Sequence, residues 1–335
     1  MTMKKTCSEY AIYCYDFHVG ERTVLNGDKD GNKFLPVAQT CFAKLFDMMT
    51  VDDLAKTDSS GKAIHYENDV MAKTGEVYWW RVNNRIAKDV VVKAGTDSSG
   101  VAVYEGSSVE SLPPCNVIID NRSEHCIIAI EKSIAFNNKP DAVRDIIHET
   151  FNRKLGDEFQ LAMRIEAMME PTEVWDFVHR KLFEEGDFIE ELTFKFENSK
   201  KVAPMTAPEI KSSRLRSLHR TLEISDALRG VFTMFFDRDG NKNISQKNKD
   251  MAEMMNLCCN KGYDILIKFK NFKIYRINDY VKRYIRMGNN LLTEFRQENL
   301  NLFGDSNTLE LWLDKVIETT NKEKRESETP KRRKK

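Results

Sequence analysis

The stretch LPPCNVIIDNRSEHCIIAIEK, residues Leu112–Lys132, decides the predicted fold. It holds two apolar runs, NVIID and CIIAI, on either side of the polar segment NRSE at Asn121–Glu124. Short apolar runs bounded by turn-forming residues are typical of buried strands. We therefore expect two neighbouring strands, joined by a polar turn, in the best-patterned part of the chain.

The chain that follows these two strands alternates between helical and strand patterns. Pro140 suits the first turn of a helix, and the apolar residues after it fall on one helix face. Strict alternation of apolar residues predicts strands at Leu161–Ala167 and Ile189–Glu197. Between these strands, Thr172 is expected to cap a helix over Glu173–Phe183. Strand, strand, helix, strand, helix, strand is the order of an α+β fold.

Upstream of the central strands the sequence also predicts mainly strands. The expected elements are a strand at Glu9–Val19, a helix at Pro36–Met49, and strands at Glu76–Asn84 and Lys88–Gly95. The segment Asp-Ser-Ser-Gly occurs twice, at residues 58–61 and 97–100, each time ahead of apolar alternation. This duplication predicts two turns that each lead into a strand.

The segment SKKVAPMTAPEIKSS at Ser199–Ser213 has two prolines and no clean period, which is typical of a domain boundary. We expect a mixed, strand-rich N-terminal α+β domain at 1–205 and a helix-rich C-terminal α+β domain at 206–320. The elements expected in the second domain are a helix at Arg214–Gly230, a strand at Val231–Phe236, a helix around Lys249–Asn260, strands at Asp264–Phe269 and Phe272–Ile277, and helices to about Thr320. The tail at 321–335 lacks apolar residues and is predicted to be disordered.

The bulk composition excludes several classes of protein. The 335 residues are 41% hydrophobic and 31% charged, as in soluble globular proteins, and no apolar run approaches the roughly 18 residues of a membrane helix. The start, MTMKKTCSEY, has no apolar stretch after its lysines, so we expect no signal peptide. Seven scattered cysteines without a C-x-x-C pair argue against a disulfide framework and a zinc ribbon. We expect a cytoplasmic protein with no cofactor and no membrane insertion.

The net charge of zero hides a basic C-terminal part. Residues 261–290 carry a balance of +6 and residues 321–335 carry +5, so the rest of the chain sums to −11. Tyr280 and Tyr284 lie among the cations, and a surface of this kind suits phosphates and stacked bases. We predict that it binds nucleic acid, although an ordinary solvated face is the alternative explanation. The predicted binding residues are Lys268, Lys270, Lys273, Arg276, Lys282, Arg283 and Arg286, with Arg214, Arg216 and Arg220 on a basic helix.

Two near-copies of one acidic segment, DKDGNK at Asp28–Lys33 and DRDGNK at Asp237–Lys242, suggest calcium loops. A calcium loop needs a glycine at position 6 and a glutamate at position 12. In the first copy position 12 falls on Val37, and in the second copy Lys242 stands where the glycine must be. Each copy fails an essential position, so we predict turns and no metal site.

Three arrangements raise the alternative of catalysis. HETFN at His148–Asn152 lacks the second histidine of a zinc-protease helix, so a zinc site is not expected there. Asp120 and Glu131 on the central strands are placed as in a metal-dependent nuclease core, but the lysine that follows the glutamate directly points to the other face. Arg214 and His219 have the Arg-x4-His spacing of a helical ribonuclease site. A nuclease that uses one of these two pairs is the enzymatic alternative.

Residues 112–197, about a quarter of the chain, resemble the core of the RexA family of lambdoid phage exclusion proteins. The resemblance rests on LPPCNVIIDNRSEHCIIAIEKSIAF, QLAMRIEAMMEPTEVWDFV and EELTFKF, and it extends to the KwaB component of the Kiwa defence system as a distant relative. It implies a cytosolic, dimeric, DNA-binding anti-phage protein that acts with a partner protein. It rests on pattern with few identities, so no site residue is transferred.

We therefore expect a non-enzymatic protein of bacterial defence that binds nucleic acid, double-stranded DNA in the first place, and forms a homodimer. The tail PKRRKK would add affinity that does not depend on base sequence. The alternatives are the nuclease effector and an adaptor whose basic surface meets an acidic protein.

Overall fold

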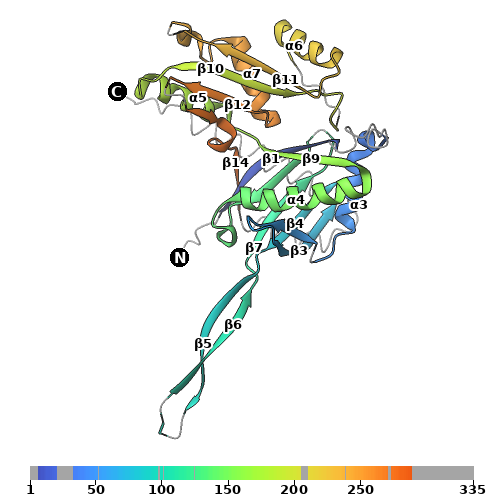
Figure 1. The fold of residues 1–335 in the computed structure, drawn as a ribbon, viewed down its shortest axis with the longest axis vertical. Helices are drawn as coiled ribbons and strands as arrows, with labels where there is room; N and C mark the ends of the chain where they lie inside the picture. Colours follow the sequence, from blue (N-terminus) through green and yellow to red (C-terminus); the bar gives the residue numbers. More distant parts are fainter. Residues whose placement is uncertain are drawn as a thin grey trace.

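The chain folds as an α+β protein, as the sequence predicts (Figure 1). The computed structural model describes residues 7–20, 33–51, 53–96, 99–100, 102–123, 125–204, 210–237, 239–270 and 273–288. Over these residues the chain forms one large antiparallel sheet, a second sheet of four strands and a separate two-stranded hairpin.

The first sheet has the strand order β14-β1-β8-β7-β4-β3-β2, and β9 also pairs with β1. Its strands are β1 (Cys7–Val19), β2 (Leu54–Thr57), β3 (Ala63–Thr74), β4 (Val77–Asn83), β7 (Pro114–Asp120), β8 (Ile127–Glu131), β9 (Leu161–Ala167) and β14 (Tyr284–Gly288). The two strands predicted within Leu112–Lys132 are β7 and β8, which pair with Val117 opposite Ile130. Ile118 and Ile119 are both buried, so both faces of β7 are covered, which explains its continuous apolar run.

Two helices cover one face of the first sheet. They are α3 (Ala38–Asp47), which follows a 3-10 turn at Leu35–Val37, and α4 (Pro140–Phe159). Aromatic rings join them to the strands: Phe151 on α4 lies 4.7 Å from Phe42 on α3, and Phe46 lies 4.4 Å from Tyr78 on β4, measured between ring centroids. Large rings of this kind contribute most of the buried area in a core.

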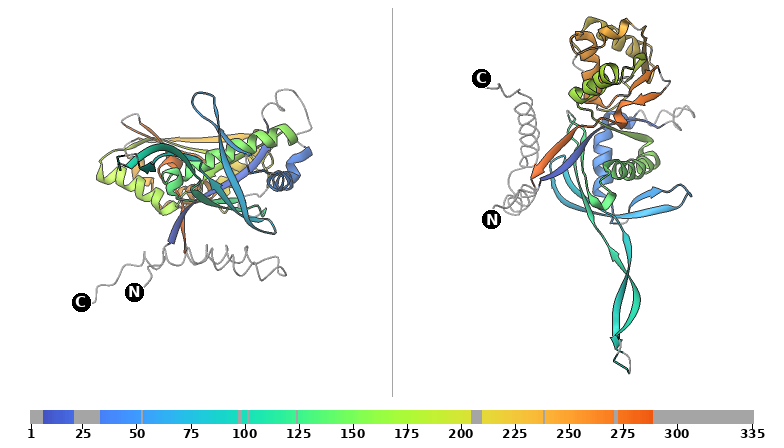
Figure 2. Two further views of the ribbon diagram at one scale, coloured as in Figure 1. Left: turned by 90° about the horizontal axis from the view of Figure 1, so that it is seen from below. Right: turned by 90° about the vertical axis from the view of Figure 1, so that its left-hand side faces the viewer.

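The hairpin of β5 (Ile86–Thr96) and β6 (Ala102–Ser111) extends away from the first sheet, as two views show (Figures 1 and 2). Its two strands pair with each other. Neither of them pairs with any other strand in the described part of the chain. Ser99 and Gly100, the described part of the second Asp-Ser-Ser-Gly segment, lie in the chain between β5 and β6, and the first segment joins β2 to β3. Gly61 and Gly100 both have a φ of +84°, a conformation that favours glycine, which confirms the two predicted turns.

The second sheet has the order β11-β10-β12-β13. Its strands are β10 (Ile189–Glu197), β11 (Arg229–Phe235), β12 (Ile265–Phe269) and β13 (Ile274–Arg276), and its helices are α5 (Pro171–His179), which continues as a π-helical turn at Arg180–Glu184, α6 (Ser213–Ile224) and α7 (Lys249–Lys261). A separate hydrophobic cluster, made by residues between Met169 and Val281, holds these elements together.

Three expectations from the sequence differ from the structure. The segment Ser199–Ser213 is not where the two sheets divide, because β10 before it already belongs to the second sheet. Tyr284–Gly288 is a strand, not a helix, because β1 offers it a free edge. Thr172 lies inside α5, and the N-cap residue is Glu170, whose side chain makes no capping hydrogen bond.

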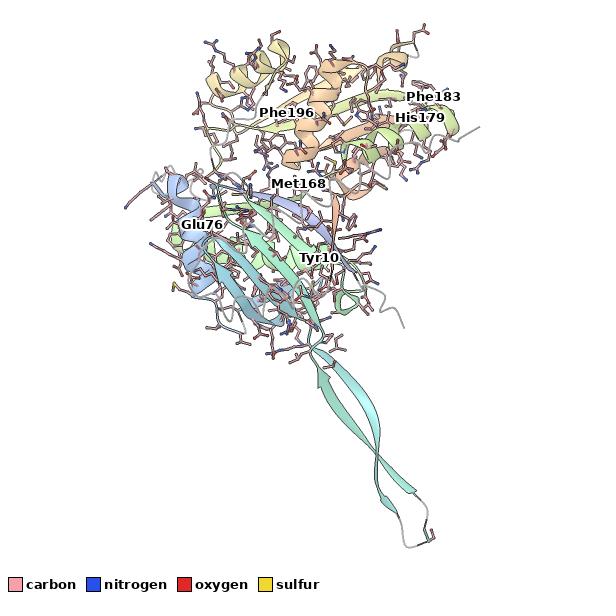
Figure 3. All side chains as sticks on the ribbon, turned by 180° about the vertical axis from the view of Figure 1, so that it is seen from behind. Tyr10, Glu76, Met168, His179, Phe183 and Phe196 are labelled. Atoms are coloured by element: carbon pink, nitrogen blue, oxygen red, sulfur yellow. The ribbon has the colours of Figure 1, made fainter. Side chains whose placement is uncertain are left out.

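Three backbone segments meet at Ile12. Its N–H donates to the carbonyl of Arg283 (3.0 Å), the N–H of Arg283 donates to the carbonyl of Met168 (2.7 Å), and the N–H of Met168 donates back to the carbonyl of Ile12 (2.9 Å). The chain leaves the first sheet at Met168 and returns to it at Arg283, and Figure 3 shows Met168 between the two sheets. The second sheet is therefore an insertion between β9 and β14.

Ion pairs between side chains reinforce this crossing. Arg276 after β12 donates to Glu166 on β9 (2.8 Å), and Lys282 pairs with Asp141 on α4. Arg164 on β9, which pairs with Asp16 on β1, lies 3.7 Å from Glu197 on β10. We call the residues that hold the two sheets together the junction: Ile12, Asp16, Asp141, Arg164, Glu166, Met168, Asp264, Arg276, Lys282 and Arg283.

The junction should weaken in acid. Burial opposes the charged form of Asp141, but the hydrogen bond and charge of Lys282 outweigh it, and the pKa of this carboxyl lies below its usual value. The pKa of Asp264 is lowered in the same way by Lys195 and Arg276 against the effect of burial. A carboxyl whose pKa is lowered in the folded state contributes stability above its unfolded pKa of about 4, and this contribution is lost as the pH falls through the folded pKa.

We therefore expect the free energy of unfolding to fall as the pH drops below about 4. Urea unfolding at pH 7, 5, 4 and 3 measures it. The variant Asp141→Asn, which cannot titrate at this position, should show a flatter dependence on pH than the wild type. Equal slopes for the two proteins would contradict the ion pair between Asp141 and Lys282.

Candidate nucleic-acid interface

The second sheet has one buried face and one open face. Leu192, Phe194 and Ile267 point inward and are fully buried, and α7 packs against this side. Because side chains alternate along a strand, the residues between them point the other way. On that side Val231 and Ile274 are 64% and 60% exposed. The alternation predicted for β12, with Ile265, Ile267 and Phe269 inward, is confirmed.

The strand register fixes the order of side chains across the open face. Phe235 on β11 lies opposite Glu191 on β10, Glu191 lies opposite Lys268 on β12, and Lys268 lies opposite Ile274 on β13. One row therefore runs across the whole sheet, with a cation near the β13 edge and an exposed aromatic residue at the β11 edge.

Cations and aromatic rings gather where β12 turns into β13. The ammonium nitrogen of Lys273 lies 4.6 Å from the ring centroid of Tyr275, whose ring lies 5.3 Å from that of Tyr280. The ammonium nitrogen of Lys270 lies 5.5 Å from the ring of Phe188. We call Lys268, Lys270, Lys273, Tyr275 and Tyr280 the basic edge.

The charges of the basic edge are only partly neutralised. Lys268 lies 3.3 Å from Glu190, whereas Lys270 and Lys273 form no ion pair with any carboxylate in the part of the chain that the structure describes. Contacts of exposed lysines with rings are worth only about 0.5–1 kcal/mol. The two ammonium groups can therefore move from the rings to a phosphate at small cost.

Two neighbours of the basic edge were not predicted from the sequence. Phe188 supports Lys270, and the ammonium nitrogen of Lys181 lies 5.3 Å from the ring of Tyr275 while it pairs with Glu185. Both residues come from the segment between α5 and β10, far from Tyr275 in the sequence. No local pattern could have found them, since only the pairing of β10 with β12 brings them close.

Three of the predicted binding residues belong instead to the junction. Arg276 donates to Asp264 (2.7 Å), Glu166 (2.8 Å) and Asp279 (3.1 Å), so its guanidinium is fully engaged. Lys282 pairs with Asp141. Arg283 donates to the side-chain oxygen of Asn260 at 2.8 Å. Arg286 on β14 lies outside this group: it is 74% exposed and 3.7 Å from Glu9.

The basic helix does not extend the basic edge. It is α6, and it packs beside β11, at the opposite end of the sheet from β13 (Figure 1). Arg216 and Arg220 are exposed there, and Arg216 donates to the carbonyl of Lys211. The backbone of Arg214 lies in α6, and its side chain is outside the described part of the structure.

The pair considered for nuclease chemistry is separated. Asp120 is buried, with the guanidinium of Arg122 and a ring nitrogen of His125 each 2.6 Å from its Oδ2. Glu131 lies at the other end of the hairpin and accepts a hydrogen bond from the side chain of Asn116 at 2.7 Å. Over the described ranges no group of three or more His, Cys, Asp or Glu is arranged to hold a metal ion.

The remaining sequence motifs have structural roles where they are described. In the second acidic segment the N–H of Gly240 donates to Asp237, and the side chain of Asn241 pairs with the backbone of Ile189. This confirms a turn. The first acidic segment, Asp28–Lys33, lies outside the described residues except for Lys33. In the HETFN segment the amide of Asn152 pairs with the backbone of Met163.

Comparisons of this chain with protein-family models, with curated proteins and with solved structures find no match. The resemblance of residues 112–197 to the RexA family therefore stays a prediction, and the candidate site rests on geometry. Within the described residues, no helix is both long and apolar enough to cross a membrane.

The structure predicts effects of different size on stability for two cations of the C-terminal part, Arg276 and Arg286. Arg276→Gln removes charge-assisted hydrogen bonds to three carboxylates and should lower the free energy of unfolding by about 1–2 kcal/mol, because those carboxylates lose their partner. Arg286→Gln, a matched change at an exposed position, should cost less than about 0.5 kcal/mol. Urea unfolding at pH 7 measures both. Equal effects of the two changes would contradict the place of Arg276 in the junction.

Proposed function

We propose that the protein binds single-stranded nucleic acid through the basic edge. The observation that carries the proposal is the position of Lys270 and Lys273, which lack ion pairs among the described residues and lie beside aromatic rings at the β12–β13 end of the second sheet. Ammonium groups contact phosphates, and aromatic rings stack on bases. The proposal is for a binding protein. Asp120 and Glu131, one of the two pairs considered for nuclease chemistry, are far apart and both are engaged in hydrogen bonds.

An unpaired strand fits the basic edge better than a duplex does. Tyr280 is 54% exposed, and base faces are open to stacking only where the bases are unpaired. The basic edge also offers three lysines, fewer than the 6–10 phosphate contacts typical of duplex binding. Double-stranded DNA, the expectation from the sequence, is the competing ligand in the test.

A cytoplasmic location, a homodimer and a role in phage defence follow from the sequence expectations alone. These three expectations are not used as support for the proposal. The basic edge makes phosphate contacts that any sequence provides, so the expected binding is salt-dependent and has little sequence preference.

We expect the triple variant Lys268→Gln, Lys270→Gln, Lys273→Gln to bind a labelled single-stranded oligonucleotide about 10-fold or more weakly at low salt, with a smaller salt dependence. Fluorescence anisotropy at 50–200 mM salt measures the affinity, with a duplex of the same sequence alongside. Each phosphate contact contributes a slope of about −0.7 in a plot of log affinity against log salt.

The double variant Arg216→Gln, Arg220→Gln is the matched control, because it removes exposed cations at the other end of the sheet. It should retain the wild-type affinity for the oligonucleotide. If the triple variant, with an unchanged unfolding midpoint, binds as tightly as the wild type, the basic edge is not the site. If the duplex binds more tightly than the single strand, the ligand of the basic edge is double-stranded nucleic acid.

An adaptor function is the second candidate, and the β11 edge favours it. Within the described residues β11 pairs with β10 alone, and Phe235 and Val231 on it are 78% and 64% exposed. An edge strand with exposed apolar side chains is a template for strand addition by another protein.

Pull-down with and without nuclease digestion separates the two functions. A partner held through β11 should survive digestion and should be lost in the variant Val231→Lys, Phe235→Lys, because a charge on each exposed position opposes strand addition. A partner that is lost on digestion and retained by this variant would contradict the adaptor function.

A further inference from the structure

Helix α6 has an apolar side and a polar side. Leu215 and Leu222 are buried against the sheet, whereas Arg216 and Arg220 are exposed. The spacing of four residues places the two guanidinium groups one helical turn apart on the same side. Each side of α6 borders a different hollow in the surface.

The hollow on the apolar side is a cavity of about 280 Å³ between α6, β11 and α7. Its walls include Phe196, Leu222, Phe232 and Leu257, with few polar groups. This volume is just below the range of about 300–1,000 Å³ that is typical of small-molecule sites. The cavity therefore suits one or two fused hydrocarbon rings or a short alkyl chain.

The hollow on the polar side is open and is lined by Arg216 and Arg220 together with Ser213, Ser217 and one carboxylate, that of Glu223. Neither arginine makes an ion pair with a carboxylate in the described part of the chain. Ile210 and His219 line both hollows, so the apolar cavity and the arginines are adjacent.

His219 lies between the two hollows with one nitrogen unused. Its Nδ1 lies 3.4 Å from Oε1 of Glu223, a carboxylate that also accepts a hydrogen bond from the hydroxyl of Ser199 at 2.9 Å. The proton on Nδ1 therefore faces Glu223, an assignment that follows from this hydrogen-bond network. The other nitrogen, Nε2, is buried and has no hydrogen-bond partner, which costs free energy until a ligand supplies one.

We propose that α6 forms a binding site for a small aryl or alkyl phosphate monoester. The hydrocarbon group occupies the apolar cavity, and the phosphate oxygens accept hydrogen bonds from Arg216 and Arg220. Nε2 of His219 accepts a hydrogen bond from the hydroxyl of the singly protonated phosphate, because the proton of the ring faces Glu223 on Nδ1. The walls of the cavity are mainly apolar, which favours a hydrocarbon over a nucleobase.

Isothermal titration calorimetry of the full chain with 1-naphthyl phosphate tests this site. The ester should bind at least 10-fold more tightly than 1-naphthol or inorganic phosphate alone, because each of these fills only one hollow. Arg216→Gln with Arg220→Gln should weaken binding of the ester about 10-fold or more and leave binding of 1-naphthol unchanged. His219→Leu should also weaken binding of the ester, whereas Arg286→Gln, the control, should not.

Leu218→Trp should fill the mouth of the cavity and abolish binding of both the ester and the alcohol. Leu218 is 41% exposed, so this variant is expected to fold, and its unfolding midpoint checks this. Binding of the ester that is no tighter than that of 1-naphthol, or that persists in the Leu218→Trp variant, would overturn the proposal. Because none of these residues belongs to the basic edge, failure here leaves the proposed nucleic-acid binding untouched.

Discussion

The ring of three backbone hydrogen bonds between Ile12, Met168 and Arg283 is the constraint on which the rest of the structure depends. It places β9 and β14 one after the other along the same side of β1. The second sheet can then be inserted between Met168 and Arg283 while both of its ends stay fixed to one strand. Junction side chains surround this crossing. They include Arg276, Lys282 and Arg283, three cations that we expected from the sequence on the nucleic-acid-binding surface.

The sequence predicts elements well where a local pattern determines them. The alternation over Leu161–Ala167 and the apolar runs of β7 and β8 each depend on residues next to one another, and all three strands form. The strand β14 was missed because its partner β1 lies at the other end of the chain. The segment Ser199–Ser213 has the composition of a boundary, yet Ala203 near its start pairs with Phe17 on β1 and so contacts the first sheet.

At the candidate site, too, sequence patterns do not show contacts between residues that are far apart in the chain. Lys273 and Arg276 are three residues apart and read alike as cations in a strand. Their ion pairing differs. Glu166, 110 residues before Arg276, accepts a hydrogen bond from its guanidinium, whereas no carboxylate in the described chain pairs with Lys273. Such a distinction depends on partners that only the folded chain brings together. The sequence predicted a surface of cations and rings, and of that set Lys268, Lys270, Lys273, Tyr275 and Tyr280 lie around β12 and β13, whereas Tyr284 and Arg286 lie on β14.

The two ends of the second sheet differ in chemistry: lysines and tyrosines of the basic edge lie around β12 and β13, and β11 carries exposed apolar residues beside α6. Ultraviolet cross-linking of a 4-thiouridine-labelled single strand, followed by mass spectrometry of the peptides, distinguishes these surfaces most directly. The account predicts adducts on the peptides that contain Tyr275 and Tyr280. Adducts confined to peptides of the first sheet, of α6 or of residues 289–335 would contradict it.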